Sequence, residues 1–149
     1  MTNKEFEEII KLKKQFSDGD ISLPMISGYA TYYVNAKDSL DKFILDVDRR
    51  SKYIEVSKHK VQSRDYSSKL PLVRIDINAP QHMNPNGTII GRNHIHYFRE
   101  EYQGDNLPFA CEIDKFDMFD FKNYLNFSSL FLDFCDFFNI NSNGVKLVV

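Results

Sequence analysis

Apolar residues recur at helical spacing at both ends of the chain. Near the start, Thr2 and Glu5 form the T-x-x-E pattern of a capping box, and apolar side chains follow at the spacing of one helix face. This pattern predicts a helix over residues 3–16. Near the end, the stripe at i, i+3, i+4, i+7 and i+11 predicts a helix with one wide apolar face. Its members are Phe127, Leu130, Phe131, Phe134 and Phe138.

The middle of the chain alternates apolar and polar residues with the period of β-strands. The segments with this character are 28–36, 41–50, 55–66, 72–79, 93–98 and 107–113. A connection rich in turn residues, "PQHMNPNGTIIGR", separates the fourth segment from the fifth. The order of elements predicts an α+β fold: an antiparallel sheet of about five or six strands, packed by an N-terminal and a C-terminal helix. We expect one domain over residues 1–149, because no linker or repeat interrupts the pattern.

Composition narrows the class of protein. The chain is 42% hydrophobic and 27% charged, which is typical of a globular domain. No apolar run is long enough for a transmembrane helix, and the charged start lacks the apolar stretch of a signal peptide. The two cysteines, Cys111 and Cys135, do not make a disulfide framework. We therefore expect a protein of the cytoplasm with no membrane partner.

Charge is distributed unevenly along the chain. Residues 37–74 carry ten Lys/Arg against six Asp/Glu, whereas residues 105–136 carry seven Asp/Glu against two Lys. An acidic region would repel nucleic acid and would suit a basic protein surface, so we expect no direct nucleic-acid binding. The candidate partner-binding residues are Asp105, Glu112, Asp114, Asp117 and Asp120. A solvated helix face would give the same pattern.

Eight of the thirteen phenylalanines lie in residues 116–140. Helical spacing assigns most of them to the core, since packing of a helix on a sheet needs large apolar side chains. Four lie off the main stripe and are candidates for an exposed protein-binding patch: Phe116, Phe119, Phe121 and Phe137.

Three of the four histidines fall within fifteen residues, in and before the segment "NHIHYF". His94 and His96 are two apart in a predicted strand, so both side chains point to one face. His82 lies in the preceding connection and could supply a third nitrogen to a zinc ion. Candidates for the fourth ligand are Asp76, Cys111 and a water molecule. His59 could contribute only if its strand were adjacent.

Two other interpretations use the same residues. The histidines could be hydrogen-bonded surface side chains without a metal. They could also serve a metal-dependent hydrolase or a small ribonuclease, with His94 or His96 as ligand or base and Arg74 or Arg99 on phosphate. No phosphate-binding glycine loop, nucleophile elbow or H-E-x-x-H motif is present, and both cysteines lie in apolar runs. We therefore favour a protein that is not an enzyme.

The segment "RIDINAPQHMNPNGTIIGRNHIHYFREEY" resembles the signature of a family of small uncharacterised bacterial and phage proteins. That signature consists of R-x-D, a small residue and Pro, then H-x-N-P-[ND]-G, then H-x-H, an aromatic residue and R-E. The matching residues are Arg74, Asp76, Ala79, Pro80, His82, Asn84, Pro85, Asn86, Gly87, His94, His96, Arg99 and Glu100. The resemblance covers about a fifth of the chain, and Ala79 replaces an expected Gly.

The small size and the composition rich in Asn and Lys also resemble phage-encoded type II-A anti-CRISPR proteins. Within that group, the chain is similar to a zinc-containing inhibitor that binds the effector nuclease and blocks DNA loading. The resemblance implies a non-enzymatic inhibitor with a structural zinc, bound through an acidic surface to a basic host nuclease. We therefore expect a phage-type inhibitor whose zinc ligands include His82, His94 and His96.

Overall fold

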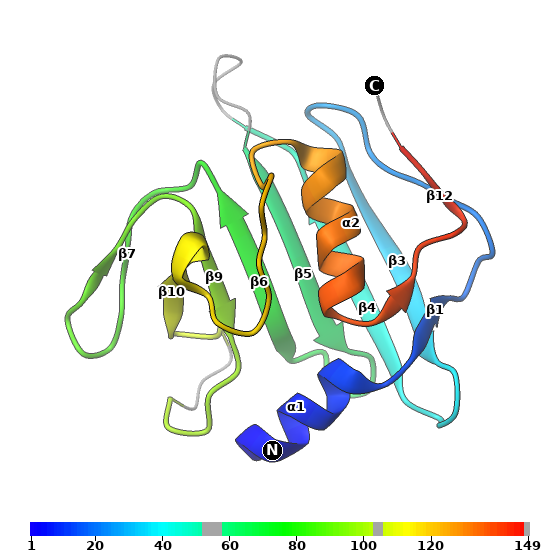
Figure 1. Cartoon of the computed structure of the whole chain (residues 1–149), viewed down its shortest axis with the longest axis horizontal. Helices are drawn as coiled ribbons and strands as arrows, with labels where there is room; N and C mark the ends of the chain where they lie inside the picture. Colours follow the sequence, from blue (N-terminus) through cyan, green and yellow to red (C-terminus); the bar gives the residue numbers. More distant parts are fainter. Residues whose placement is uncertain (52–57, 103–105, 148–149) are drawn as a thin grey trace.

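Eight strands of the computed structural model form one sheet, in the order β10-β9-β6-β5-β4-β3-β1-β11 (Figure 1). The structure describes residues 1–51, 58–102 and 106–147. Neighbouring strands are antiparallel, except for β1 and β11, which are parallel. The strands of this sheet are β1 (Lys14–Phe16), β3 (Tyr29–Ala36), β4 (Lys42–Asp48), β5 (His59–Asp65), β6 (Pro71–Ile77), β9 (His94–Tyr97), β10 (Ala110–Glu112) and β11 (Ile140–Asn141). The predicted α+β class is confirmed, and the sheet has more strands than the five or six expected.

Two short strand pairs flank this sheet. β2 (Ile21–Ser22) pairs with β12 (Val145–Lys146), and β7 (His82–Met83) pairs with β8 (Ile89–Ile90) as a hairpin. The other elements are the helices α1 (Asn3–Lys11) and α2 (Phe127–Phe137) and a short 3-10 helix, η1 (Ile113–Lys115). The β7–β8 hairpin projects beyond the β10 end of the sheet (Figure 1).

The N-terminal helix is shorter than its pattern predicted. Its start is confirmed, because the Thr2 hydroxyl accepts a hydrogen bond from the Glu5 amide at 3.1 Å. The predicted end at residue 16 is wrong: α1 ends at Lys11, and Lys14–Phe16 forms β1. Strand pairing on both sides, with β3 and with β11, outweighs the helical spacing there.

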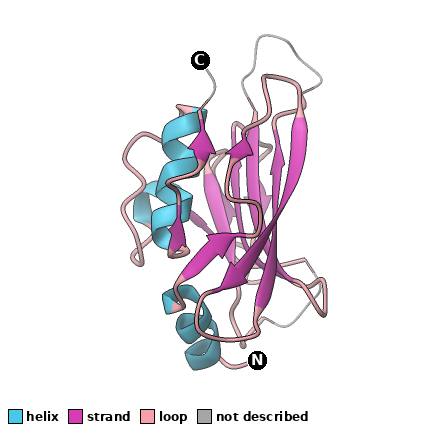
Figure 2. Cartoon of the chain, turned by 90° about the vertical axis from the view of Figure 1, so that its right-hand side faces the viewer, coloured by secondary structure: helices cyan, strands magenta, loops and turns pink. Residues whose placement is uncertain are grey.

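Both helices lie on the same side of the sheet (Figure 2). The predicted stripe on α2 is buried against the alternating apolar residues of the strands, including Val34, Leu45 and Ile75. Three of the four phenylalanines that were candidates for an exposed patch are also buried: Phe116, Phe121 and Phe137. These rings pack edge to face or tilted against one another, which places them in the core rather than in a partner interface.

The opposite side of the sheet carries no helix in the part of the chain that the structure describes (Figure 2). Because side chains alternate along a strand, most polar residues of β3 to β6 face this side, whereas His59 and Ser63 share the inward face of β5 with Val61. Arg74 and Asp76 of β6 belong to it, as predicted from the alternation with Val73, Ile75 and Ile77.

Candidate metal centre

The central residues of the candidate site come from two adjacent strands. β6 and β9 pair antiparallel, with Asp76 opposite His94 and Arg74 opposite His96. Residues directly opposite in such a pair project from the same face of the sheet. Asp76, His94 and His96 therefore meet on the side of the sheet away from α2.

The three side chains converge on a single carboxylate oxygen. Nε2 of His94 and Nε2 of His96 each lie 3.3 Å from Oδ2 of Asp76. Ligand atoms held about 2.0–2.1 Å from a tetrahedral zinc ion are separated by about 3.3–3.4 Å. The observed separations match the edges of such a tetrahedron, and this group can hold a metal ion.

Backbone carbonyls fix the orientation of both imidazole rings. Nδ1 of His94 donates to the Gly91 carbonyl at 2.7 Å, and Nδ1 of His96 donates to the Leu107 carbonyl at 2.8 Å. Because a carbonyl only accepts, each Nδ1 carries the proton, and Nε2 of the neutral ring presents a lone pair. Leu107 adopts a left-handed backbone conformation (φ 48°), which is uncommon for a residue other than glycine.

The electrostatics of the group are compatible with a cation between these atoms. Burial lowers the pKa of His96, which favours its neutral form. Burial alone would raise the pKa of Asp76, whereas the positive charge of Arg74 lowers it and favours the carboxylate. A carboxylate oxygen thus faces two imidazole lone pairs. Moreover, Oδ1 of Asp76 is buried and has no hydrogen-bond partner among the described residues.

His82 lies beside this group without joining it as closely. Its ring centroid is 4.6 Å from that of His96 and 5.9 Å from that of His94. Nε2 of His82 lies 2.8 Å from the Pro108 carbonyl, so Nδ1 keeps the lone pair. The structure therefore brings all three predicted histidines close to Asp76. The ligand atoms that lie closest together belong to Asp76, His94 and His96.

Two other candidate ligands lie on the wrong face of the sheet. Cys111 is opposite Ile95, one position out of register with His94 and His96, so its thiol is directed away from their side chains. It instead donates to the Glu112 carbonyl at 3.2 Å. His59 packs against the Phe127 ring on the α2 side. The suggestion of Cys111 as a fourth ligand is thus inconsistent with its strand register.

The candidate centre is enclosed. Asp76, His94 and His96 are 4%, 2% and 1% exposed, respectively. The rings of His82 and His96 donate hydrogen bonds to the Pro108 and Leu107 carbonyls, respectively, and so hold this segment against the site. A closed group of this kind is typical of a structural metal, whereas a catalytic metal keeps one position open to solvent.

The residue that holds the hairpin in place was not recognised from the sequence. The Asn84 side chain forms two hydrogen bonds of 2.8 Å with the backbone of Ala110, one with its amide and one with its carbonyl. The Asn84 side chain therefore occupies backbone hydrogen-bonding groups of the edge strand β10 that a neighbouring strand would otherwise use. The sequence "NPNG" predicted a turn here. It did not predict the partner of Asn84, because Ala110 lies 26 residues further along the chain.

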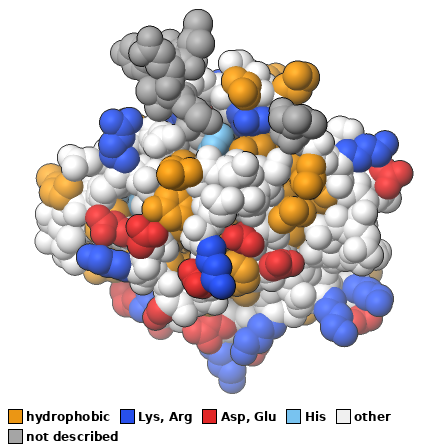
Figure 3. Space-filling view, turned by 45° about the horizontal axis from the view of Figure 1, so that its top comes forward, with side chains coloured by type: hydrophobic (Ala, Val, Ile, Leu, Met, Phe, Trp, Pro, Cys, Tyr) orange, Lys and Arg blue, Asp and Glu red, His pale blue; other side chains and the backbone are white. Residues whose placement is uncertain are grey.

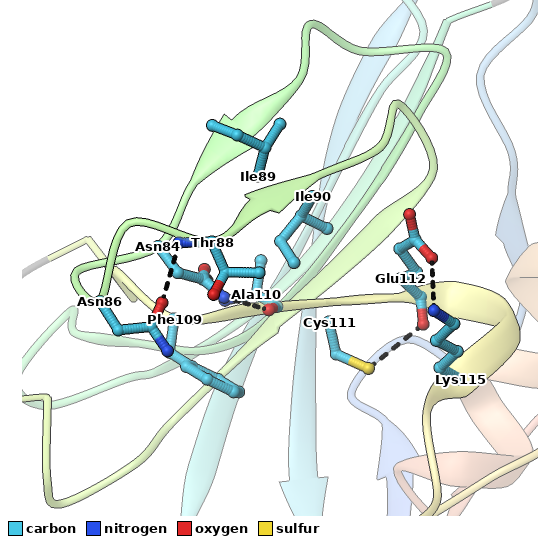
Figure 4. Close-up of a pocket in the computed structure, with 10 residues that line it drawn as sticks. All are labelled: Asn84, Asn86, Thr88, Ile89, Ile90, Phe109, Ala110, Cys111, Glu112 and Lys115. Carbon is cyan, nitrogen blue, oxygen red and sulfur yellow. Dashed lines mark hydrogen bonds and ion pairs between the residues drawn. The ribbon is translucent and has the colours of Figure 1, made fainter.

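A pocket of about 380 Å³ separates the hairpin from β10 (Figure 4). Ile89, Ile90 and Phe109 supply apolar walls, and Glu112 pairs with Lys115 at 3.4 Å on the other side. Cys111 also lines this pocket, but burial raises the pKa of its thiol. This thiol is therefore a poor nucleophile at neutral pH.

The predicted partner-binding residues occupy several positions on the surface. Asp114, Asp117 and Asp120 are exposed in and after η1, whereas Glu112 is half-buried in β10. Asp105 lies outside the described residues. Seen from the side that carries α2, acidic side chains are interspersed with Lys and Arg (Figure 3). Lys115, which is exposed next to Asp114 in η1, adds a basic side chain among these acidic residues.

The fold and the site define an α+β protein with a buried carboxylate–histidine group able to hold a metal ion. The chain belongs to a family of unknown function, DUF6978, whose model matches residues 1–140. This match includes the whole candidate centre and both helices. No curated protein and no solved structure matches the chain. Among the described residues, no helix has the length and apolar character required to cross a membrane.

Proposed function

We propose that the protein is a zinc-binding interaction protein in which the ion stabilises the fold. The observation that carries this proposal is the pair of 3.3 Å separations between Oδ2 of Asp76 and the two Nε2 atoms. Nitrogen ligands from imidazole together with a carboxylate oxygen suit zinc. His82 would turn its Nδ1 toward the ion as the fourth ligand. Bound zinc would supply the positive charge that this buried set of acceptors needs.

A structural ion at this position would join segments that are distant in the sequence. Asp76 belongs to β6, His94 and His96 belong to β9, and His82 begins the hairpin. Because ligands are rarely preassembled in an unfolded chain, the free energy of zinc binding would add to the free energy of folding.

Thermal unfolding tests the structural role. Zinc-loaded protein should lose several degrees of Tm when a chelator removes the ion, and added zinc should restore it. Asp76→Asn should abolish this response, whereas Asp46→Asn, on the same sheet face, should retain it. A Tm that is the same with chelator and with zinc would overturn the structural role.

For the partner, we propose a basic host nuclease. The supporting observations are the exposed carboxylates of Asp114, Asp117 and Asp120, and the resemblance to type II-A anti-CRISPR proteins. These carboxylates would compete with nucleic acid for the basic surface of the CRISPR effector in the cytoplasm of the host cell. Such competition should weaken as the salt concentration rises.

Charge reversal tests the proposed interface. Replacing Asp114, Asp117 and Asp120 by Lys should lower affinity for the effector nuclease, measured by calorimetry, by tenfold or more. A matched control reverses three exposed aspartates elsewhere, Asp18, Asp20 and Asp38. An equal loss in both variants would indicate net charge rather than an interface, and unchanged affinity in the first would refute the interface.

The alternative function is a metal-dependent hydrolase or toxin-like ribonuclease. Arg74 favours it, because its Nε lies 3.2 Å from Oδ2 of Asp76 and its side chain retains 21% exposure, within reach of a phosphate. The burial of Asp76, His94 and His96 opposes it. Degradation of RNA or DNA by the purified protein, abolished in His96→Gln with the fold intact, would replace the structural account.

A further inference from the structure

The basic segment of the chain forms the bare face of the sheet. Residues 37–74 contain β4, β5 and most of β6, and the side chains at alternate positions of these strands lie on the face opposite α2. Together with the outward residues of β3, these side chains form a surface that is separate from the acidic residues after η1. Its polar and aromatic strand residues include Tyr29, Thr31, Tyr33, Lys42, Asp46, Asp48, Lys60, Gln62 and Arg64.

Three tyrosine rings are exposed on this face or at its end. Tyr29, Tyr33 and Tyr66 retain 65%, 54% and 42% of their surface, respectively. Tyr33 and Tyr66 meet edge to face, with 6.1 Å between ring centroids. Next to this pair is a hollow of about 370 Å³, lined in part by Tyr33, Tyr66 and Lys42.

Each end of this row of rings has cations beside it. The Arg50 guanidinium lies 4.3 Å from the Tyr29 ring centroid, and Nζ of Lys69 lies 4.0 Å from that of Tyr66. Nζ of Lys42 lies 5.9 Å from the Tyr66 ring. Aromatic faces next to basic side chains can therefore receive a group that is both flat and anionic.

The net charge of this surface is positive. Asp46 and Asp48 are neutralised by Arg64 and Arg50, at 2.6 Å and 2.9 Å. Within the described ranges, no salt bridge engages Lys42, Lys60 or Lys69. The three lysines therefore give this face an uncompensated positive charge.

We propose that this surface, the tyrosine–lysine face, binds single-stranded nucleic acid. Unpaired bases would stack on Tyr33 and Tyr66 near the hollow and on Tyr29 at the far end, while the lysines contact phosphates. Tyr33 lies four positions after Tyr29 along β3, a span of about 13 Å, which a short single strand can cross. A duplex cannot use the rings in this way, because its bases are already stacked and paired.

This inference reverses the expectation that the chain does not bind nucleic acid directly. That expectation treated the charge of residues 105–136 as the charge of the binding surface. In the fold, Asp114, Asp117 and Asp120 lie in and after η1, whereas Lys42, Lys60 and Arg64 lie on β4 and β5. The inference is independent of the proposed zinc and of the proposed nuclease partner.

Fluorescence anisotropy with labelled oligothymidine and with the same sequence as a duplex tests the proposal. Wild-type protein should bind the single strand at low salt, with affinity falling as salt rises. Tyr33→Ala/Tyr66→Ala should weaken binding about tenfold or more, because base stacking is lost. Lys42→Gln/Lys69→Gln should weaken binding and reduce the salt dependence. The matched control, Lys115→Gln/Lys122→Gln, removes two exposed lysines from the other side and should bind as wild type.

Four results would overturn the proposal. They are no binding of the single strand at low salt, equal binding of the duplex, an undiminished affinity in the tyrosine variant, and equal binding of polyglutamate. The last two would indicate a surface for acidic polypeptides, which uses the lysines without the rings. The substituted side chains are exposed or surface-facing, and a thermal melt of each variant verifies its fold.

Discussion

The ammonium group of Lys14 donates a hydrogen bond to the backbone carbonyl of Phe138 at 2.6 Å. It also donates to the carbonyls of Ile9 and Leu12, at 2.6 Å and 2.8 Å. The C-terminal ends of both helices, which leave carbonyls unpaired, thus share one buried cation. Lys14 is 2% exposed, and its Nζ lies 4.1 Å from the Phe138 ring centroid.

Loss of this cation should weaken the packing of both helix ends. We expect Lys14→Met, which keeps most of the volume, to lower the free energy of unfolding by about 2–3 kcal/mol, because buried carbonyls lose their donor. Urea unfolding measures the change. Lys13→Met removes the neighbouring exposed lysine and should have little effect. Equal stability of the Lys14 and Lys13 variants would contradict the capping role.

The same lysine should make stability depend on pH. Burial lowers the pKa of Lys14 to about 7, below the ordinary lysine value of 10.5. Between these values the unfolded chain binds more protons than the folded chain, so stability should rise with pH above 7. The rise is at most about 1.4 kcal/mol per pH unit. Urea unfolding at pH 7 and pH 9 should show this slope in wild type and not in Lys14→Met. An equal change in stability between pH 7 and pH 9 in wild type and in Lys14→Met would contradict the lowered pKa of Lys14.

Asn84 should hold the hairpin to the sheet edge. Asn84→Ala removes both hydrogen bonds to Ala110, and we expect a loss of about 1–3 kcal/mol of stability. In this variant, the Ala110 amide hydrogen should exchange with solvent faster than in wild type. Asn86→Ala changes an exposed asparagine in the same turn and should leave that amide protected. Unchanged exchange in Asn84→Ala would indicate that another contact holds the hairpin.

The close approach of two glycines permits the pairing of β2 with β12. A Cβ atom at Gly144 would lie 1.8 Å from the Gly19 carbonyl oxygen, whereas a Cβ at Gly19 would meet nothing within 4 Å. We expect Gly144→Ala to cost about 1–3 kcal/mol through this overlap, and Gly19→Ala to cost much less. Thermal unfolding of the two variants checks the difference. Equal melting temperatures would contradict the tight approach.

Local patterns in the sequence predicted most of the larger elements. The alternation of Val73, Ile75 and Ile77 with Arg74 and Asp76 correctly divided β6 into a core face and a polar face. This works because the period of side chains in a strand is fixed by the backbone. The short strands β1 and β11, at the end of the sheet opposite β10, were missed, since a strand of two or three residues has too few side chains to show a period.

The candidate centre could be predicted only in part. Two histidines in one strand had to share a face, so His94 and His96 were identified as neighbours. The side on which Cys111 lies depended on the register between β9 and β10, which no local pattern fixes. The carbonyls that orient the rings, from Gly91 and Leu107, carry no sequence signal because every residue has one.

The central claim is that Asp76, His94 and His96 hold a zinc ion. The most direct test is elemental analysis of tag-free protein, for wild type, for His94→Ala/His96→Ala and for the control Asp46→Asn. About one zinc per chain in wild type and control, and none in the double variant, is the result we predict. Wild-type protein that contains no metal and takes up none from added zinc would contradict the claim.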